Sequence, residues 1–136
     1  MNDNNQISDK IKQKNQSIIA SITDPITKDI IKFNIVNDHT LWRAKTMFTK
    51  EPITIKWIRT FDKESVFFDI GANIGIYSMF AAIINSSKVY SFEPESNNFQ
   101  TLMQNIITNN LSGSVIPFQI GISDKTGLTK LNLNNF

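Results

Sequence analysis

The sequence contains no cysteine and a single histidine among its 136 residues. Without cysteine the chain forms no disulfide, offers no thiolate nucleophile and has no thiolate ligand for zinc or an iron–sulfur cluster. One histidine cannot build a multi-histidine metal site, so we expect no metal centre. That histidine, His39, lies in a predicted polar loop after the turn pair Asn37-Asp38, where we expect it to be a surface residue.

The chain also lacks a strong excess of charge and a long apolar run. Its 14 Lys and Arg against 12 Asp and Glu give a net charge of +2, and they are scattered, so we expect no nucleic-acid partner. No apolar stretch approaches the roughly twenty residues of a membrane span. The first residues, MNDNNQISDKIKQKNQ, are too polar for a signal peptide. We therefore expect no membrane association and a cytoplasmic location.

The length allows one domain, which we divide into an N-terminal extension of one helix and one strand over 1–48 and a larger part over 49–136. Five isoleucines at helical spacing predict an amphipathic helix that ends before Asp24-Pro25; they are Ile7, Ile11, Ile18, Ile19 and Ile22. Residues 30–36 (IIKFNIV) predict a strand. The stretch TKEPITIKWIRTF predicts a helix whose apolar face carries Ile53, Trp57, Ile58 and Phe61.

From Ser65 onward, predicted strands and helices alternate. The strands are VFFDI (66–70), KVYSF (88–92) and VIPFQI (115–120), and the first reads as buried on both faces. Helical patterns follow the first two strands, from Ile76 to Asn85 and from Ser96 to Asn110. A turn, SDKTG, then leads to LTKLNL, which predicts an antiparallel return strand. This order is typical of an α/β fold with a Rossmann-like, doubly wound parallel sheet.

Two features meet where the first two predicted strands end. The loop DIGANIG carries Gly71 and Gly75, which let the backbone turn sharply and let a ligand approach. We expect its backbone N–H groups to face a ligand at a helix N-terminus, where an anion is favoured by roughly 0.3–1 kcal/mol. Glu93 follows the second strand, 22 residues after Gly71, and its carboxylate can accept hydrogen bonds from both ribose hydroxyls. Together they predict a site for a nucleoside-containing cofactor.

The loop departs from the dinucleotide pattern G-x-G-x-x-G. Asn73 stands where the second glycine belongs, and Gly75 comes one position early. Asp69 directly precedes the loop; its carboxylate repels a pyrophosphate but can serve an ammonium group, or hold the loop through backbone N–H groups. S-adenosylmethionine combines a ribose with an ammonium and a carboxylate, so it fits better than NAD. A nucleotide-dependent oxidoreductase is the less favoured alternative.

The stretches VFFDIGANIGIYSMFAA and VYSFEPESNNFQTLMQNIITNN, followed by the SDKTG turn, resemble the FkbM family of class I S-adenosylmethionine-dependent methyltransferases. The resemblance covers roughly Glu51 to the C-terminus. It implies that Glu93 holds the ribose, that Asn98 bonds backbone near the Glu93 turn, and that the first cofactor motif is formed by Asp69, Gly71, Asn73 and Gly75. It also implies O-methylation of a hydroxyl on a small molecule or carbohydrate acceptor.

The resemblance further implies a seven-stranded sheet, whereas this sequence supplies three predicted parallel strands and one return strand. The fold we expect is therefore an incomplete class I methyltransferase sheet. The family's candidates for a catalytic base lie in the absent portion, so we assign no catalytic residue. A second reading is a truncated, non-catalytic fragment that needs a partner chain or self-associates through an exposed sheet edge.

Overall fold

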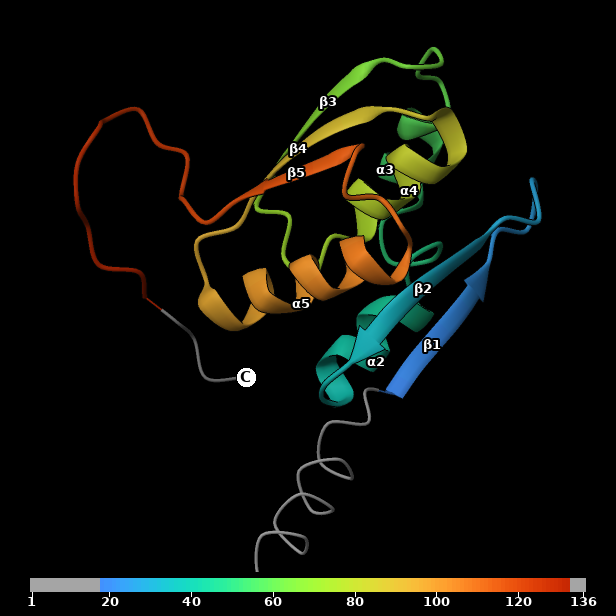
Figure 1. The fold of residues 1–136 in the computed structure, drawn as a ribbon, viewed down its shortest axis with the longest axis horizontal. Coiled ribbons are helices and arrows are strands. Elements are labelled where there is room, and N and C mark those ends of the chain that lie inside the picture. The colour runs from blue at the N-terminus through green and yellow to red at the C-terminus, as the bar shows by residue number, and fades with distance from the viewer. Residues whose placement is uncertain (1–17, 133–136) are drawn as a thin grey trace, which may run out of the picture.

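A computed structural model of the chain describes residues 18–132, and its elements form two separate sheets with four helices (Figure 1). The strands are β1 (Ile18–Thr23), β2 (Ile30–Ile35), β3 (Val66–Ile70), β4 (Lys88–Phe92) and β5 (Val115–Phe118). The helices are α2 (Asp38–Lys45), α3 (Pro52–Ile58), α4 (Ile76–Asn85) and α5 (Ser96–Thr108). None of these helices is both long enough and apolar enough to cross a membrane.

The N-terminal sheet is an antiparallel hairpin of β1 and β2, in which Ile18 pairs with Ile35 and Thr23 with Ile30. The helix predicted over the N-terminal isoleucines is therefore wrong where it reaches β1, and its first part lies outside the described residues. Isoleucine fits a strand as well as a helix, and pairing with β2 decides between the two. The predicted strand at 30–36 is confirmed as β2.

Helix α2 replaces the loop expected around His39. Asn37 caps this helix, and Thr40 bonds back to the backbone of Asn37, which together form a capping box. His39 is exposed, as expected, and stacks on Trp42 at a ring distance of 5.9 Å. The turn pair Asn37-Asp38 thus starts a helix.

Helix α3 is confirmed within the predicted segment, but its buried face differs from the prediction. Ile55 and Ile58 are buried, whereas Ile53 is 81% exposed and Trp57 is 54% exposed. The helix is only two turns long, so few of its residues can be buried. Which residues these are depends on how α3 packs against α4.

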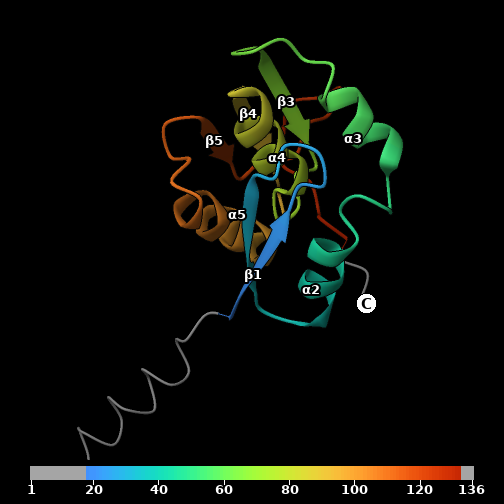
Figure 2. The same cartoon turned by 90° about the vertical axis from the view of Figure 1, so that its right-hand side faces the viewer.

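The larger sheet is parallel, in the order β3-β4-β5, and confirms the predicted α/β pattern. Helices α4 and α5 link its strands in succession, and both lie on the same face of the sheet (Figures 1 and 2). Right-handed crossovers that advance in one direction place successive helices on one side. Strand β2 runs along α5, and the hairpin shares a single hydrophobic core with the parallel sheet.

The opposite face of the parallel sheet is open within the described residues. Phe67 and Asp69 of β3 are buried, but Val66, Phe68 and Ile70 are 57%, 59% and 62% exposed. The expectation that β3 is buried on both faces is therefore wrong, because helices cover only one side. Four stacked rings line the other side, with neighbouring centroids 5.2–6.4 Å apart; this open aromatic face consists of Phe68, Tyr90, Phe92 and Phe118.

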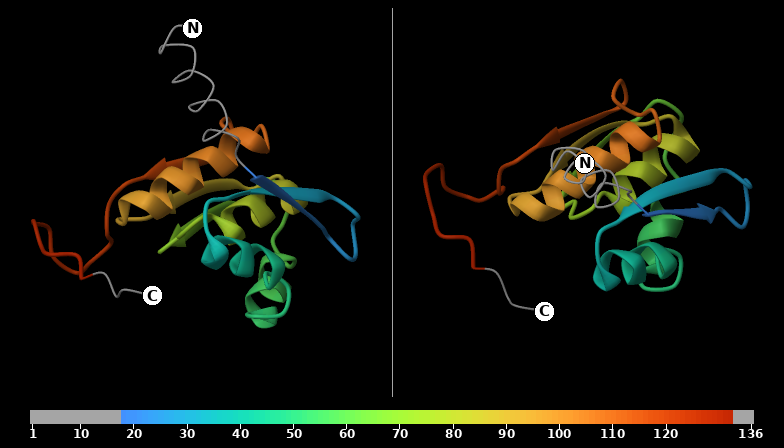
Figure 3. Two further views of the ribbon diagram at one scale, coloured as in Figure 1. Left: turned by 90° about the horizontal axis from the view of Figure 1, so that it is seen from below. Right: turned by 60° about the horizontal axis from the view of Figure 1, so that its bottom comes forward.

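After β5 the chain runs away from the sheet (Figures 1 and 3). Residues 119–132 contain no strand, so the return strand predicted over LTKLNL is wrong for all of its described part. Leu128 is fully exposed, and residues 121–132 are exposed throughout. Because these side chains stay exposed, the alternating pattern alone does not make a strand here.

Candidate functional site

The site is built at the carboxyl ends of β3 and β4. These strands are parallel, and Ile70 pairs with Phe92, so Gly71 and Glu93 leave the sheet next to each other. The backbone N–H groups of Gly71 and Ala72 both donate to the carbonyl of Phe92, at 2.9 and 3.0 Å. The register of the sheet thus brings together the two sequence features that predicted a cofactor site.

The Glu93 side chain is 5% exposed and touches the loop directly. Its Oε2 accepts the N–H of Asn73 at 2.7 Å, and its Oε1 accepts the N–H of Glu95 at 2.8 Å. A carboxylate has about four lone-pair positions, so each oxygen can still accept a second hydrogen bond. Glu93 therefore fixes the loop and keeps acceptor capacity on both oxygens, but its side chain is buried and is not among the residues that line the cavity beside the loop.

The loop does not present free N–H groups, contrary to expectation. Every backbone N–H from Gly71 to Gly75 donates inside the protein. Besides the bonds to Phe92 and Glu93, Ile74 donates to the Asn73 side chain at 3.0 Å and Gly75 to the Ala72 carbonyl at 2.8 Å. An anionic ligand next to this loop must find its hydrogen-bond donors elsewhere.

The two glycines of the loop have different roles. Both have positive φ, +80° at Gly71 and +84° at Gly75, where a side chain is strained. A Cβ on Gly75 would lie 2.5 Å from Cδ1 of Leu102, so this residue lets α5 pack closely. A Cβ on Gly71 would meet no atom within 4 Å, and Gly71 instead lines a cavity.

Asp69 is buried at the end of β3, and its Oδ2 accepts the hydroxyl of Ser78 at 2.5 Å. The same hydroxyl lies 2.7 Å from that of Ser91 on β4. Burial raises the pKa of the Asp69 carboxyl, the bonds from Ser78 oppose that rise, and the charge of Glu93 adds to it. The sequence left two roles open for Asp69: binding an ammonium group or holding the loop. Asp69 does not hold the loop, because each backbone N–H from Gly71 to Gly75 donates to another acceptor.

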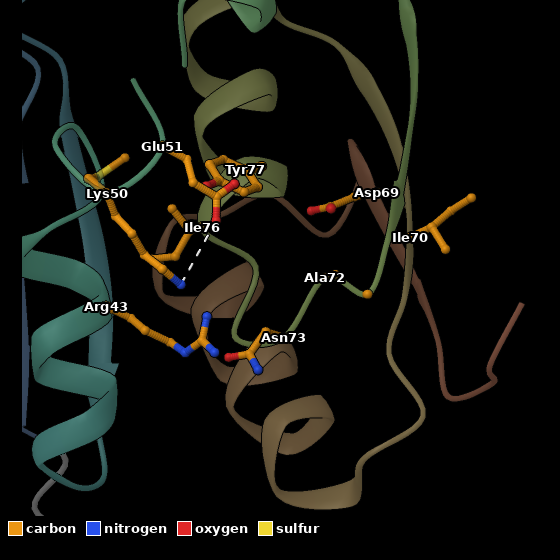
Figure 4. A pocket seen from close by; sticks show the side chains of 11 residues that line it. Arg43, Lys50, Glu51, Asp69, Ile70, Ala72, Asn73, Ile76 and Tyr77 are labelled. Carbon is orange, nitrogen blue, oxygen red and sulfur yellow. Dashed lines mark ion pairs between the residues drawn. The ribbon is translucent and has the colours of Figure 1, made fainter. Parts of the chain in front are cut away.

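A cavity of about 270 Å³ opens beside the loop, and Asp69, Gly71 and Asn73 line it (Figure 4). Other charged and polar side chains that line it are Arg43, Lys50 and Glu51, which precede β3 in the chain, and Tyr77 of α4. None of these four was identified as a site residue from the sequence. Neither spacing nor a motif connects Arg43, Lys50 and Glu51 to the loop, so only the packing of α2 and of the segment before α3 reveals them.

Lys50 and Glu51 form an ion pair at 3.9 Å, and Lys50 Nζ also lies 5.1 Å from the ring centroid of Trp42. Burial raises the pKa of the Tyr77 phenol, and a hydrogen bond to the Glu51 carboxylate raises it further. Tyr77 therefore stays protonated at neutral pH and does not act as a base there.

Asn105 of α5 holds the loop at Ile74. No role was assigned to this residue from the sequence. It is fully buried in α5, donates to the Ile74 carbonyl at 2.8 Å and accepts from the backbone N–H of Asn34 at 2.7 Å. An asparagine on the apolar face of a predicted helix was the available signal. The local role expected of Asn98 belongs to Glu95, whose carboxylate accepts the N–H of Asn98 at 2.7 Å.

Comparison with solved structures identifies methyltransferases that share this fold. The TYW2 protein of P. horikoshii, solved in complex with MeSAdo, is 19% identical with a TM-score of 0.54, and the match covers 82% of this chain and 39% of that one. TYW2 of M. jannaschii, solved with AdoMet, is 24% identical with a TM-score of 0.49, over 75% of this chain and 43% of that one. No family model and no curated protein matches the sequence.

The chain therefore spans about two fifths of the length of these structural neighbours. The fold of this chain, with its parallel sheet of three strands, is accordingly an incomplete Rossmann-like α/β fold of the kind found in such a neighbour.

Proposed function

We propose that this chain is the cofactor-binding part of an S-adenosylmethionine-dependent methyltransferase. The observation that carries the proposal is the contact between Glu93 and the loop at Asn73, at the tips of two adjacent parallel strands and next to a cavity. The fold shared with P. horikoshii TYW2, a protein solved with MeSAdo, supports the same cofactor class.

The residues fit this cofactor in three respects. Glu93 has spare acceptor positions for the two ribose hydroxyls. Gly71 lines the cavity, and a Cβ on it would meet no protein atom within 4 Å, so a ligand can lie against its backbone. Asp69, buried beside the cavity, is an acceptor for the ammonium of the methionine moiety.

The finer function we propose is O-methylation, in the manner of the FkbM family, with a hydroxyl of a sugar or small metabolite as acceptor. When bound, S-adenosylmethionine supplies a methyl group on a sulfonium, and the reaction breaks that S–C bond, forms an O–C bond and releases the hydroxyl proton. The role we give to the residues that line the cavity is to orient the cofactor. Correct positioning of the reacting atoms supplies much of the rate of such a transfer. A catalytic base stays unassigned, and the cytoplasmic location expected from the sequence stays a prediction.

Isothermal titration calorimetry with S-adenosylhomocysteine tests the cofactor. We expect micromolar binding by the wild type and at least tenfold weaker binding by Glu93→Gln, since a charge-assisted hydrogen bond contributes about 1.5–3 kcal/mol and 1.4 kcal/mol is tenfold in affinity. Glu95→Gln is the matched control, because it neutralises a neighbouring carboxylate that accepts the N–H groups of Asn97 and Asn98 and does not bond to the loop. No binding by the folded wild type, or preference for NAD, contradicts the proposal.

A second candidate is a non-catalytic part of a methyltransferase fold that another polypeptide completes. The open aromatic face and the unpaired outer edge of β3 support it within the described residues. The occupant we propose is a segment that carries the further strands and helices present in the structural neighbours, of which this chain spans about two fifths. This candidate predicts weak or absent S-adenosylhomocysteine binding together with self-association of the isolated chain.

A further inference from the structure

Arg43 of α2 is a half-buried cation at the cavity with no protein partner to explain it. Its Nε is buried without a hydrogen-bond partner in the described part of the chain. Its guanidinium belongs to neither of the ion pairs found there, Lys50–Glu51 and Arg59–Asp24. A buried donor that gains no hydrogen bond costs about 1–3 kcal/mol, so such a group in a cavity wall points to a ligand.

The surroundings of Arg43 select an anionic ligand group. Figure 4 shows its guanidinium pointing from α2 toward the loop at Asn73. The backbone N–H groups of that loop all donate to acceptors within the protein, so none is available to hydrogen-bond an anion. Lys50, the other cation that lines the cavity, is already paired with Glu51. Arg43 is thus the cavity cation whose donors remain available.

The ligand group must also suit the acid on the other side of the cavity. Asp69 is buried at the end of β3 and lines the same cavity as Arg43. One wall therefore presents a cation with free donors, and the other presents a carboxyl. An amino-acid zwitterion has the complementary pair, with a carboxylate for the first wall and an ammonium for the second.

We propose that Arg43 binds the carboxylate of the methionine moiety of S-adenosylmethionine, opposite Asp69. This inference rests on the proposed function and deepens it by naming the residue that recognises the amino-acid end of the cofactor. The planar guanidinium can hold a carboxylate with two parallel hydrogen bonds. Arg43 then plays the part that loop N–H groups play at other anion sites.

Two ligands that differ only in the amino-acid moiety test this assignment. S-adenosylhomocysteine carries the carboxylate and ammonium, whereas 5′-methylthioadenosine keeps the nucleoside and the sulfur but lacks both. Calorimetry on Arg43→Gln should show about ten- to hundredfold weaker binding of S-adenosylhomocysteine and unchanged binding of 5′-methylthioadenosine. Lys45→Gln is the matched control: it removes an exposed positive charge from the same helix and should leave both affinities unchanged.

The outcomes separate the two proposals. If the wild type binds neither ligand, the proposed function fails. If the wild type binds both and Arg43→Gln lowers both affinities equally, or neither, the assignment of Arg43 fails while the proposed function stands. Urea unfolding of Arg43→Gln should show stability equal to or above that of the wild type, because the substitution removes an unpartnered half-buried charge; a marked loss of stability would show a structural role and overturn the assignment.

Discussion

The carboxylate of Glu93 accepts the backbone N–H of Asn73 at 2.7 Å and so joins the tip of β4 to the loop that follows β3. Its second oxygen accepts the N–H of Glu95, and the side chain is 5% exposed. One buried residue therefore shapes the candidate site through Asn73, a loop residue that lines the cavity. Variants of Glu93 must be compared for stability as well as for ligand binding.

Glu93→Ala leaves the N–H groups of Asn73 and Glu95 without their acceptor. We expect a loss of about 2–4 kcal/mol in the free energy of unfolding, since each buried unsatisfied group costs about 1–3 kcal/mol. Glu93→Gln keeps one acceptor oxygen and should lose about half as much. Urea denaturation followed by circular dichroism measures both, and equal stability of Glu93→Ala and wild type would contradict the role given to these bonds.

Alanine at the two loop glycines should separate stability from binding. Gly75→Ala combines a φ of +84° with a 2.5 Å approach to Leu102, so we expect a loss well above the roughly 1–2 kcal/mol of left-handed backbone strain. Gly71→Ala carries the strain alone, because its Cβ meets no atom within 4 Å. Because Gly71 lines the cavity, a methyl group there should weaken S-adenosylhomocysteine binding.

Thermal denaturation and calorimetry on the two variants test this contrast. Each glycine serves as the control for the other, because both have nearly the same φ. If the Gly71→Ala protein is less stable than the Gly75→Ala protein, the close approach of Gly75 to Leu102 of α5 does not determine how well the loop tolerates a side chain.

The buried ion pair between Asp24 and Arg59 ties the hairpin to α3, and it should make stability depend on pH. The Asp24 side chain is fully buried and also accepts the N–H groups of Ile26 and Thr27. Burial alone would raise the pKa of Asp24, but those backbone bonds and the Arg59 guanidinium outweigh it and hold the pKa below its ordinary value of 3.8. A lowered pKa in the folded state stabilises the protein above pH 3.8, and this contribution disappears as the pH falls through the folded pKa.

Asp24→Asn should therefore lose about 3 kcal/mol near neutral pH, as expected when one partner of a buried pair is removed. The difference from wild type should shrink as the pH falls below 3.8, because the wild-type carboxyl then becomes neutral as well. Urea unfolding of both proteins over this pH range measures the difference. Asp62→Asn, at an exposed position, is the control, and a difference that grows with falling pH would contradict the sign.

The open aromatic face should cause the isolated chain to self-associate at micromolar concentration. Phe68 is 59% exposed and stacks on Tyr90 at 5.4 Å, so Phe68→Lys should reduce association at a cost in stability of about 1 kcal/mol or less. Size-exclusion chromatography with light scattering measures the change. Ile53→Lys is the control, since Ile53 is 81% exposed on α3 and does not belong to the open aromatic face, and an equal effect of both variants would show nonspecific association.

The sequence by itself determined the parallel unit and the meeting of its strand tips. Strands β3 and β4 and helices α4 and α5 were all predicted, because each carries a hydrophobic period or apolar run of its own and is joined to the next by a short connection. Because β3 and β4 are parallel neighbours, the residues that follow their carboxyl ends, Gly71 and Glu93, lie near each other. These are consequences of local pattern and of a connection rule that few chains break.

The tertiary structure decided what local pattern leaves open. Ile18 to Thr23 form a strand because β2 supplies hydrogen-bond partners, although the same isoleucines have helical spacing. One face of β3 is open because both crossover helices pack on the other. Arg43 reaches the cavity across nearly thirty residues of sequence only because α2 packs beside the loop. A side chain's environment depends on contacts between distant segments, and a single sequence read locally does not contain those contacts.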